Sequence, residues 1–257
     1  MRKNTVKQAL AEGKLQLGTG FGQIRSPEIP KMLAAAGFHW AFVDMEHGGF
    51  DLETVQDICR VSVMAGLSPI VRVGELQYTL VARALDCGAQ GVIFPRVESP
   101  EVLAKAVSWA KFPPVGIRGY GLTALHIDYE KASFSQVIEH MNANTMVVVQ
   151  IETQLAVDRR EELLAVPGVD AVMVGPADLS ISLGVPGDFE HPKMVKTIES
   201  IIETCKRRGV IPGMQTRTTT LARFWKDRGM LFLGCNNDAG MLFERATEVA
   251  GQILSGA

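Results

Sequence analysis

The sequence has no long apolar run and no excess of charge of either sign. No apolar stretch reaches the roughly 18 residues that a membrane-spanning helix requires. The basic N-terminus is not followed by an apolar segment of signal-peptide length. The 257 residues carry a formal net charge of −2, whereas binding to nucleic acid needs a basic face. We therefore expect a cytoplasmic protein that binds neither membrane nor nucleic acid.

Cysteine is also scarce, and the four cysteines form no CxxC pair. They are widely spaced, at Cys59, Cys87, Cys205 and Cys235. This spacing favours buried thiols in a reducing compartment over a zinc site built on them. A Gly-rich GxGxxG turn after the first predicted strand is missing too, which argues against a dinucleotide-binding fold.

What the chain does contain is a repeated alternation of short apolar runs and helical patterns. The expected strands are Leu15–Thr19, His39–Asp44, Pro69–Arg72, Gly91–Pro95, Met146–Ile151, Ala171–Val174, Ile211–Met214 and Met230–Gly234. The expected helices are Pro27–Ala36, Leu52–Ala65, Leu76–Cys87, Glu101–Ala110, Leu155–Ala165, Lys193–Arg208, Thr219–Arg228 and Ala239–Leu254. Eight such units predict an α/β fold, a single (β/α)₈ TIM barrel over residues 1–257, although an open doubly wound sheet has the same local patterns.

One connection is too long for a simple barrel loop. It runs from Lys111 to Asn144, and a helix is expected within it over Ser133–Met141. Its GIRGYG segment, Gly116–Gly121, contains three glycines and Arg118. Loops of this length are usually functional or contain helices. We interpret the segment as a mobile lid or a subunit contact, or alternatively as a solvated surface loop.

Polar side chains follow several of the predicted strands. These are Asp44, Glu46, His47, Arg72, Arg96, Gln150, Glu152 and Asp178. In a TIM barrel the chemistry lies at the carboxyl ends of the strands, so we expect these side chains to converge on one mouth.

Glu152 and Asp178 are carboxylates at the ends of successive predicted strands. Neighbouring carboxylates with open positions for water suit Mg²⁺ or Mn²⁺. Without a metal, one of the two would take up a proton, as in the acid/base pair of a glycosidase. The metal site is the interpretation that we prefer.

His47 and Arg72 are the other candidates for catalysis. Asp44 lies three residues before His47, and a carboxylate beside an imidazole can fix its tautomer, as in a general base. Arg72 is predicted at the end of a buried strand, where it either pairs with Asp44 or Glu152 or faces a developing enolate oxygen. The turn Gly175-Pro176-Ala177 before Asp178 offers backbone N–H groups to an anionic substrate.

Six runs of the sequence together resemble the HpcH/HpaI aldolases, class II pyruvate aldolases of the phosphoenolpyruvate/pyruvate-binding barrel superfamily. The runs are Ala34–Gly48, Pro69–Val73, Ala84–Ser99, Pro113–Gly121, Val147–Thr153 and Val169–Ser180. They are spread over essentially the whole chain. The combination of QIE and GPADLS, one βα unit apart, is the most specific of these motifs.

The resemblance implies a metal-dependent lyase that reversibly cleaves a 4-hydroxy-2-oxo acid, of the 2-keto-3-deoxy acid or the 4-hydroxy-2-oxoheptanedioate type, to pyruvate and an aldehyde. It implies Glu152 and Asp178 as ligands of a divalent metal, Mg²⁺ before Mn²⁺ or Co²⁺. It implies His47 as the base and Arg72 as the stabiliser of the transition state. The implied contacts to pyruvate come from Gln150, Gly175, Pro176, Ala177 and Asp178.

The resemblance also implies a homo-oligomer, a hexamer of paired trimers. Asp86 would reach the active site of a neighbouring subunit and support the histidine there, while Asp44 would lie close to the histidine of its own chain. The helix Ala239–Leu254 would be exchanged between subunits.

Three places depart from the pattern of the family. Gln16 stands where a tryptophan of the mouth is usual, and Gly48–Phe50 and Val73–Glu75 replace other typical runs. The pyruvate half of the site is therefore expected to be retained and the aldehyde half to be altered.

Other functions remain open: oxaloacetate decarboxylation, a CoA ester lyase like citrate lyase, or a non-catalytic barrel that binds a 2-oxo acid. A Schiff-base mechanism is disfavoured because no lysine is predicted at the mouth.

Overall fold

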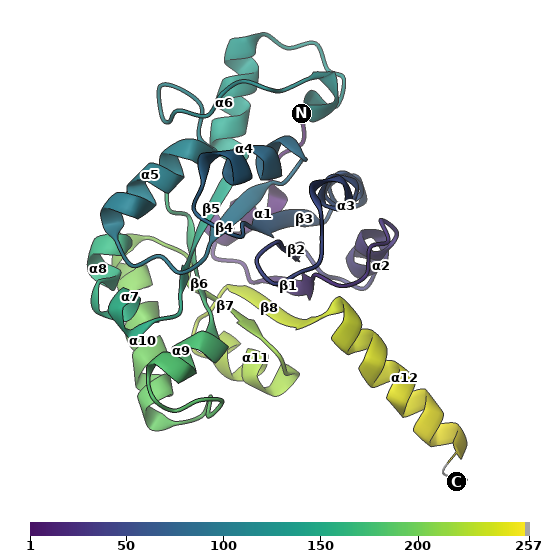
Figure 1. The fold of residues 1–257 in the computed structure, drawn as a ribbon, viewed down its shortest axis with the longest axis vertical. Coiled ribbons are helices and arrows are strands. Elements are labelled where there is room, and N and C mark those ends of the chain that lie inside the picture. Colours follow the sequence, from purple (N-terminus) through teal and green to yellow (C-terminus); the bar gives the residue numbers. More distant parts are fainter. Residues whose placement is uncertain (255–257) are drawn as a thin grey trace.

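The structure is a computed structural model that describes residues 1–254, and it contains a closed eight-stranded parallel barrel. The strands follow one another around the barrel in chain order (Figure 1). They are β1 (Gln16–Phe21), β2 (Trp40–Asp44), β3 (Ser68–Arg72), β4 (Gly91–Phe94), β5 (Met146–Ile151), β6 (Ala171–Val174), β7 (Gly213–Thr216) and β8 (Phe232–Asn237). The predicted (β/α)₈ barrel is confirmed.

Helices surround the barrel and connect its strands (Figure 1). The main ones are α2 (Ile29–Ala35), α3 (Leu52–Ala65), α4 (Tyr78–Asp86), α5 (Pro100–Ala110), α7 (Gln154–Asp158), α8 (Arg160–Leu163), α10 (Pro192–Arg208), α11 (Thr219–Lys226) and α12 (Asp238–Leu254). The predicted helix Leu155–Ala165 is divided into α7 and α8 at Arg159. Two helices end at a glycine, Gly66 or Gly209, in the left-handed conformation that glycine adopts easily.

Alternate residues of each strand face the inside and the outside of the barrel. Trp40, Ile70, Ile93 and Val148 belong to a buried cluster that fills the barrel, whereas their neighbours Ala41, Val71, Val92 and Val147 pack under the outer helices. Side chains of successive strand residues point to opposite faces. This alternation determines which residues at the strand ends can point into the mouth.

A helix that the sequence analysis did not predict, α1 (Thr5–Ala11), covers the amino end of the barrel. Its buried Val6 and Leu10 join the inner cluster beside Trp40. Asn4 caps the helix by accepting a hydrogen bond from the backbone N–H of Lys7. Gly18 of β1 leaves room for Trp40, because a Cβ at Gly18 would lie 2.2 Å from the indole ring. The amino end of the barrel is therefore closed by packing.

The long connection between α5 and β5 contains the expected helix, observed as α6 (Phe134–Asn144), and a short 3₁₀ helix, η1 (Ala124–Ile127). Its predicted role as a lid or a solvated loop is wrong for Arg118. That side chain is only 3% exposed, and its Nη2 donates to Asp86 Oδ1 at 2.6 Å. The segment connects the end of a helix to the start of a strand, which places it at the amino end of the barrel, away from the mouth.

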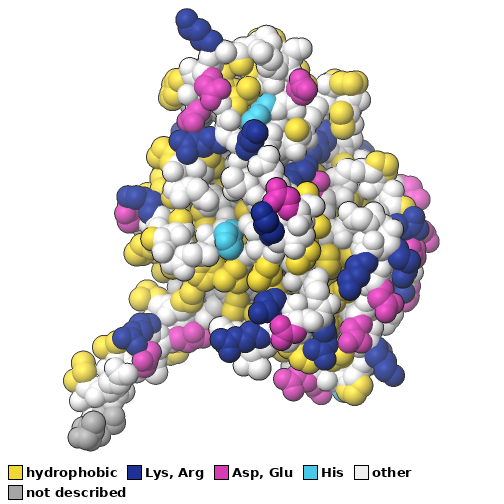
Figure 2. All heavy atoms as spheres, turned by 180° about the vertical axis from the view of Figure 1, so that it is seen from behind, with side chains coloured by type: hydrophobic (Ala, Val, Ile, Leu, Met, Phe, Trp, Pro, Cys, Tyr) yellow, Lys and Arg dark blue, Asp and Glu magenta, His cyan; other side chains and the backbone are white. Residues whose placement is uncertain are grey.

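The C-terminal helix α12 projects away from the barrel (Figure 1). Leu242, Phe243, Ile253 and Leu254 on this helix are 62–84% exposed. On the face shown in Figure 2, positive and negative side chains are interspersed, and apolar side chains lie along the projecting helix. Within residues 1–254, no helix is both long enough and apolar enough to cross a membrane. All four cysteines are buried and free, as expected.

Candidate active site

A cavity of about 320 Å³ opens at the carboxyl end of the barrel. Side chains that follow seven of the eight strands line it, and Asp44, His47, Arg72, Gln150 and Asp178 are among them. For these five side chains the predicted convergence on one mouth is observed, whereas Glu46, Arg96 and Glu152 are not among the lining residues. The alternation of the strands explains it, because Asp44 continues the inward series of Trp40 and Phe42, and Arg72 follows inward-facing Ile70.

Arg72 is held by two carboxylates. Its Nε lies 2.9 Å from Asp44 Oδ1 and its Nη2 lies 2.6 Å from Asp44 Oδ2, which makes a two-point pair. Its Nη1 is 2.9 Å from Glu46 Oε2. Arg72 as a whole is only 7% exposed, and its guanidinium carbon lies 5.0 Å from the centre of the Phe42 ring. The ion pair with Asp44 fixes the orientation of a positive charge at the mouth.

The pKa of Asp44 reflects this pairing. Burial alone would raise the pKa, but the hydrogen bond and charge of Arg72, with the backbone N–H groups of His47 and Glu46, hold the pKa below its usual value. The carboxylate therefore stays ionised and bound to Arg72.

The expected support of the His47 ring by Asp44 is not what the structure shows. Asp44 Oδ1 accepts the backbone N–H of His47 at 3.2 Å, so it fixes the loop. The imidazole is 62% exposed, and its Nε2 lies 3.9 Å from Glu46 Oε2. Glu46, to which the sequence analysis gave no role, is thus the carboxylate beside both Arg72 and the histidine ring.

Glu152 and Gln150 form a buried pair at the end of β5. Gln150 Nε2 donates to Glu152 Oε2 at 2.5 Å, and the backbone N–H of Arg96 donates to Glu152 Oε1 at 2.8 Å. Glu152 is 3% exposed. Burial raises the pKa of Glu152, the Arg96 N–H opposes this rise, and the negative charges of Asp178 and Glu46 add to it. A bound cation would relieve this crowding of negative charge.

Gly175 leaves room for the side chains of Glu152 and Gln150, because it has no Cβ atom. A Cβ at position 175 would lie 2.6 Å from Glu152 Oε2 and 2.8 Å from Gln150 Nε2. The glycine also precedes α9 (Pro176–Ser182), a helix that the sequence analysis treated only as a turn. The first backbone N–H groups of a helix have no partner within it. Those of Ala177 and Asp178 are therefore available at the mouth, which both residues line.

Asp178 is the second carboxylate expected to bind metal. Its side chain is 45% exposed, and its Oδ1 lies 3.8 Å from Nη2 of Arg96. Arg96, with φ of 52°, also places its Nε 3.5 Å from Glu46 Oε1. Within residues 1–254, no group of three or more His, Cys, Asp or Glu side chains is arranged to hold a metal ion. Two protein oxygens with water and substrate completing the shell are enough for Mg²⁺.

Asp86 is not brought to the mouth of its own chain. It ends α4 and pairs with buried Arg118 at 2.6 Å. Its side chain is 34% exposed, so part of the carboxylate faces outward. Because α4 ends just before β4 begins, Asp86 lies toward the amino end of the barrel.

The expectation that Gln16 stands at the mouth is wrong. Gln16 begins β1, and Gly20, Phe21 and Gly22 occupy the mouth end of that strand. Of the other departures, Gly48 lines the cavity, whereas Val73 is buried under the outer helices.

Further lining residues come from the ends of β1, β7 and β8, which the sequence analysis did not include. They are Gln23, Gln215, Arg217, Asn236, Asn237 and Asp238. Asp238 is 5% exposed, and its Oδ2 accepts the backbone N–H groups of Gln23 and Ile24 at 3.0 and 2.7 Å. The rule that the chemistry of a TIM barrel lies at the carboxyl ends of its strands would have found these residues if the predicted strands had been two or three residues longer.

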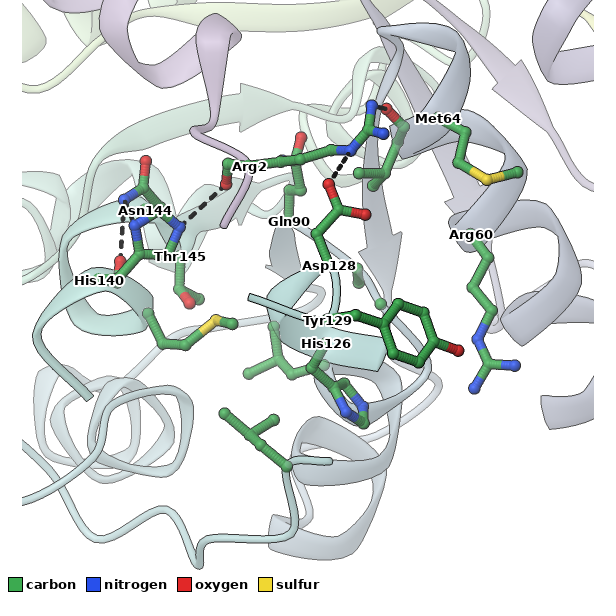
Figure 3. Close-up of a pocket in the computed structure, with 16 residues that line it drawn as sticks. Arg2, Arg60, Met64, Gln90, His126, Asp128, Tyr129, His140, Asn144 and Thr145 are labelled. Atoms are coloured by element: carbon green, nitrogen blue, oxygen red, sulfur yellow. Dashed lines mark hydrogen bonds and ion pairs between the residues drawn. The ribbon is translucent and has the colours of Figure 1, made fainter. Parts of the chain in front are cut away.

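A second cavity of about 290 Å³ lies elsewhere, at the amino ends of β4 and β5 (Figure 3). Gln90 and Thr145, which directly precede these strands, line it together with residues of α3 and α6. Its one carboxylate, Asp128, accepts a hydrogen bond from Arg2 Nε at 2.9 Å. It contains none of the predicted catalytic side chains.

A (β/α)₈ barrel with carboxylates and an oriented arginine at the carboxyl ends of its strands has the arrangement of an enzyme active site. The family model for HpcH/HpaI aldolase/citrate lyase matches residues 21–238, so the chain belongs to this family and is a carbon–carbon lyase.

Full-length relatives agree with this assignment. The chain is 34% identical to a hydroxypyruvate/pyruvate aldolase of Roseovarius nubinhibens, with 95% of each chain covered. It is 32% identical to a 4-hydroxy-2-oxo-heptane-1,7-dioate aldolase of Salmonella dublin, over 99% of this chain and 98% of the other. The crystal structure of an HpcH/HpaI aldolase from Desulfitobacterium hafniense superimposes with a TM-score of 0.93 at 32% identity, covering 98% of this chain and 97% of that one.

Proposed function

We propose that the chain catalyses the divalent-metal-dependent, reversible aldol cleavage of a 4-hydroxy-2-oxo acid to pyruvate and an aldehyde. The observation that carries this proposal is the orientation of Arg72 by Asp44 at the mouth that Gln150 and Asp178 also line. The names of the two relatives, a hydroxypyruvate/pyruvate aldolase and a 4-hydroxy-2-oxo-heptane-1,7-dioate aldolase, support the substrate class.

Glu152 and Asp178 would hold the metal. Both provide the carboxylate oxygens that Mg²⁺ prefers, with Mn²⁺ or Co²⁺ as alternatives. The raised pKa of Glu152, caused by burial and by the charges of Asp178 and Glu46, fits a site that is completed by a cation. When bound, the cation would supply Lewis-acid stabilisation of negative charge on the 2-oxo group.

The chain's own groups perform the remaining tasks. Gln150 orients Glu152 through its 2.5 Å hydrogen bond. The backbone N–H groups of Ala177 and Asp178, next to Gly175 and Pro176, would bind the substrate carboxylate. Arg72 would face the oxygen on which negative charge develops as the bond between C3 and C4 breaks.

His47 would accept the proton of the 4-hydroxyl group, directly or through water. Its ring is exposed at the mouth, within reach of a substrate bound there. The aldehyde then leaves, and protonation of the enolate at C3 gives pyruvate. Of the residues described, no lysine lines this cavity, which favours the metal route over a Schiff base.

We further propose that the working form is a homo-oligomer, a hexamer of paired trimers. Buried Arg118 presents the Asp86 carboxylate at the surface, where it could reach a neighbouring mouth. The exposed apolar side chains of α12, such as Phe243, which is 73% exposed, suit a helix that packs on another subunit.

A pyruvate-release assay over 4-hydroxy-2-oxo acids of varied length and charge tests this function. We expect turnover with Mg²⁺ or Mn²⁺, none in excess chelator, and no covalent trapping of pyruvate by borohydride. Full activity in chelator, or a borohydride-trapped adduct, would contradict the metal mechanism. Release of carbon dioxide without an aldehyde product would point to oxaloacetate decarboxylation instead.

A further inference from the structure

The second cavity, at the amino ends of β4 and β5, contains an arginine that has no partner in the described part of the chain (Figure 3). Arg60 lies on α3 and lines this cavity. Its Nε is buried without a hydrogen-bond partner, and Arg60 forms no ion pair or side-chain hydrogen bond with any of residues 1–254. Such a buried N–H group is rare in folded proteins, because it has lost water and gained no other acceptor.

The neighbouring arginines differ from Arg60 in this respect. Arg118 also has a buried Nε without a partner, but its Nη2 donates to Asp86 Oδ1 at 2.6 Å. Arg2, which lines the same cavity, donates from its Nε to Asp128 Oδ2 at 2.9 Å. Asp128 is the carboxylate of the described wall, so the wall offers Arg60 no free counter-charge.

Other polar side chains of the wall are already hydrogen-bonded within the chain. They are Gln90, His126, His140 and Asn144. The His126 ring is fixed at both nitrogens. Its Nε2 lies 2.7 Å from the carbonyl oxygen of Asp86, and its Nδ1 accepts the backbone N–H of Thr123 at 2.9 Å. These side chains shape the cavity, whereas Arg60 remains available to a ligand.

Much of the remaining wall is apolar and adaptable. Its apolar side chains are Val63, Met64, Leu85, Leu122 and Met141. Methionine fits many ligand shapes, because its side chain is unbranched, flexible and polarizable. The volume of about 290 Å³ is at the small end of the range of ligand pockets. This wall therefore suits a small molecule with a compact apolar body and a single negative charge.

Asp128 and Tyr129 contribute to the wall in an unusual backbone conformation. Their φ angles are 59° and 60°, which is uncommon for residues other than glycine. The pairing of Arg2 with Asp128 and a hydrogen bond of 2.9 Å from the Tyr129 N–H to the carbonyl of Ala124 hold this segment. In Figure 3 the Tyr129 ring points toward the side of the cavity that Arg60 occupies. Strained backbone of this kind often lies at ligand sites.

We propose that this cavity binds a small amphipathic monocarboxylate, with its carboxylate on Arg60 and its apolar body against Met64 and Met141. A planar guanidinium matches a carboxylate by two parallel hydrogen bonds, which would give the buried Nε its acceptor. A phosphate dianion would need more unpaired cations than this one. The wall has no free carboxylate for acid–base chemistry, so the ligand is held without being converted. The site lies at the opposite end of the barrel from the mouth and does not depend on the reaction proposed there.

Titration calorimetry on the full chain in its assembled state tests this site. The probes are hexanoate and phenylacetate, each compared with its uncharged amide, hexanamide or phenylacetamide. The variants are Arg60→Gln and Leu122→Trp, the second of which fills the cavity from a half-buried residue of its wall. Arg83→Gln is the matched control, because Arg83 is an exposed arginine of α4 that does not line the cavity. Arg72→Lys reports on binding at the mouth instead.

We expect at least one acid to bind the unaltered protein about 10–100-fold more tightly than its amide, the ratio that a hydrogen bond to a charged group gives. Arg60→Gln should lose this difference without a lower melting temperature, because it removes a buried N–H group that has no partner. Leu122→Trp should weaken the binding of acid and amide alike. Arg83→Gln and Arg72→Lys should leave both affinities unchanged.

Three results would overturn the inference. One is that neither acid binds, as would happen if a side chain of a neighbouring subunit filled the cavity. Another is that the acids bind Arg60→Gln as tightly as the unaltered protein. The third is loss of acid binding in Arg72→Lys but not in Leu122→Trp, which would place the acids at the mouth. None of the three bears on the proposed aldol cleavage, because these titrations do not depend on turnover.

Discussion

Arg72 and Asp44 form a two-point ion pair across neighbouring strands, with N–O distances of 2.9 and 2.6 Å. The two residues are direct register partners of β3 and β2. Both belong to the inward-facing series of their strands, so the barrel itself places them together at the mouth. Asp44 therefore orients the arginine more than it orients the histidine.

Replacing Arg72 by lysine tests the orientation of this charge. Lysine keeps the charge but cannot make the two-point contact with Asp44. We expect kcat to fall by about 10²–10³-fold, the cost of losing one aligned group in an oxyanion site. Metal affinity, measured by titration calorimetry, should change little. A variant with unaltered kcat would show that Arg72 has no part in the chemistry. Arg223→Lys is the surface control.

The stability of Asp44→Asn relative to the unaltered protein should depend on pH. The folded-state pKa of Asp44 is lowered from the ordinary aspartate value of 3.8, because Arg72 and two backbone N–H groups outweigh the effect of burial. The ionised carboxylate therefore stabilises the fold above that value. The contribution is lost as the pH falls through the lowered pKa.

Urea unfolding measures this dependence. We expect Asp44→Asn to lower the free energy of unfolding by about 1–3 kcal/mol near neutral pH. The difference should stay constant down to about pH 5 and shrink once the pH falls below the ordinary aspartate pKa of 3.8. A difference that grows as the pH falls would contradict the assigned pairing.

Removal of either carboxylate should abolish metal binding. We expect Glu152→Gln and Asp178→Asn each to lose measurable affinity for Mg²⁺ and Mn²⁺ in titration calorimetry, because each change removes one of the two carboxylates of the proposed site. The fold should remain, as judged by circular dichroism. Glu190→Gln is the control, since Glu190 is exposed and does not line the cavity. Metal affinity that survives both changes would exclude this pair as the ligands.

Much of the fold could be predicted from local sequence patterns, and the errors of that prediction have a common physical cause. β5 and β6 were predicted with their observed bounds, because β6 is a continuous apolar run, β5 is interrupted only by Gln150, and both strands are buried on both faces. β7 and β8 were predicted to end early, at Met214 and Gly234. Gln215 and Asn236 are polar, and only pairing with neighbouring strands extends β7 and β8.

The same limit applies to the site. Arg72, Glu152 and Asp178 could be found because Arg72 ends a recognisable apolar strand and the two carboxylates follow such strands closely. Arg217 could not, because its strand appeared to end three residues before it. The partner of Arg72 was predicted only as one of two alternatives. The choice of Asp44 over Glu152 depends on strand register, which a single sequence does not reveal.

The apolar face of α12 should hold the oligomer together. Leu242 and Phe243 are 62% and 73% exposed, and burying each side chain in a subunit contact is worth about 1.5–3 kcal/mol. We expect Leu242→Ser combined with Phe243→Ser to yield a smaller species by light scattering after gel filtration. Val102→Ser on α5, at 45% exposure, is the control. An unchanged mass for the double variant would contradict a role for α12 in assembly.

Gly175 should be essential for the metal site although it has no side chain. Its φ of −92° is open to any residue, so alanine causes no backbone strain there. The added Cβ would instead lie 2.6 Å from Glu152 Oε2 and 2.8 Å from Gln150 Nε2, and these two buried groups would have to separate. We expect Gly175→Ala to weaken Mg²⁺ binding by about 10–100-fold, as loss of a group that orients a ligand does.

Gly49→Ala is the matched control, because its Cβ would meet only Arg25 Nη2, at an ordinary 3.7 Å. Titration calorimetry with Mg²⁺ and thermal unfolding without metal separate the two effects of the methyl group. If Glu152 and Gln150 form the metal-binding edge, Gly175→Ala should lose affinity while its melting temperature changes by a few degrees at most. Equal Mg²⁺ affinity in the two alanine variants would mean that the ion binds away from Glu152.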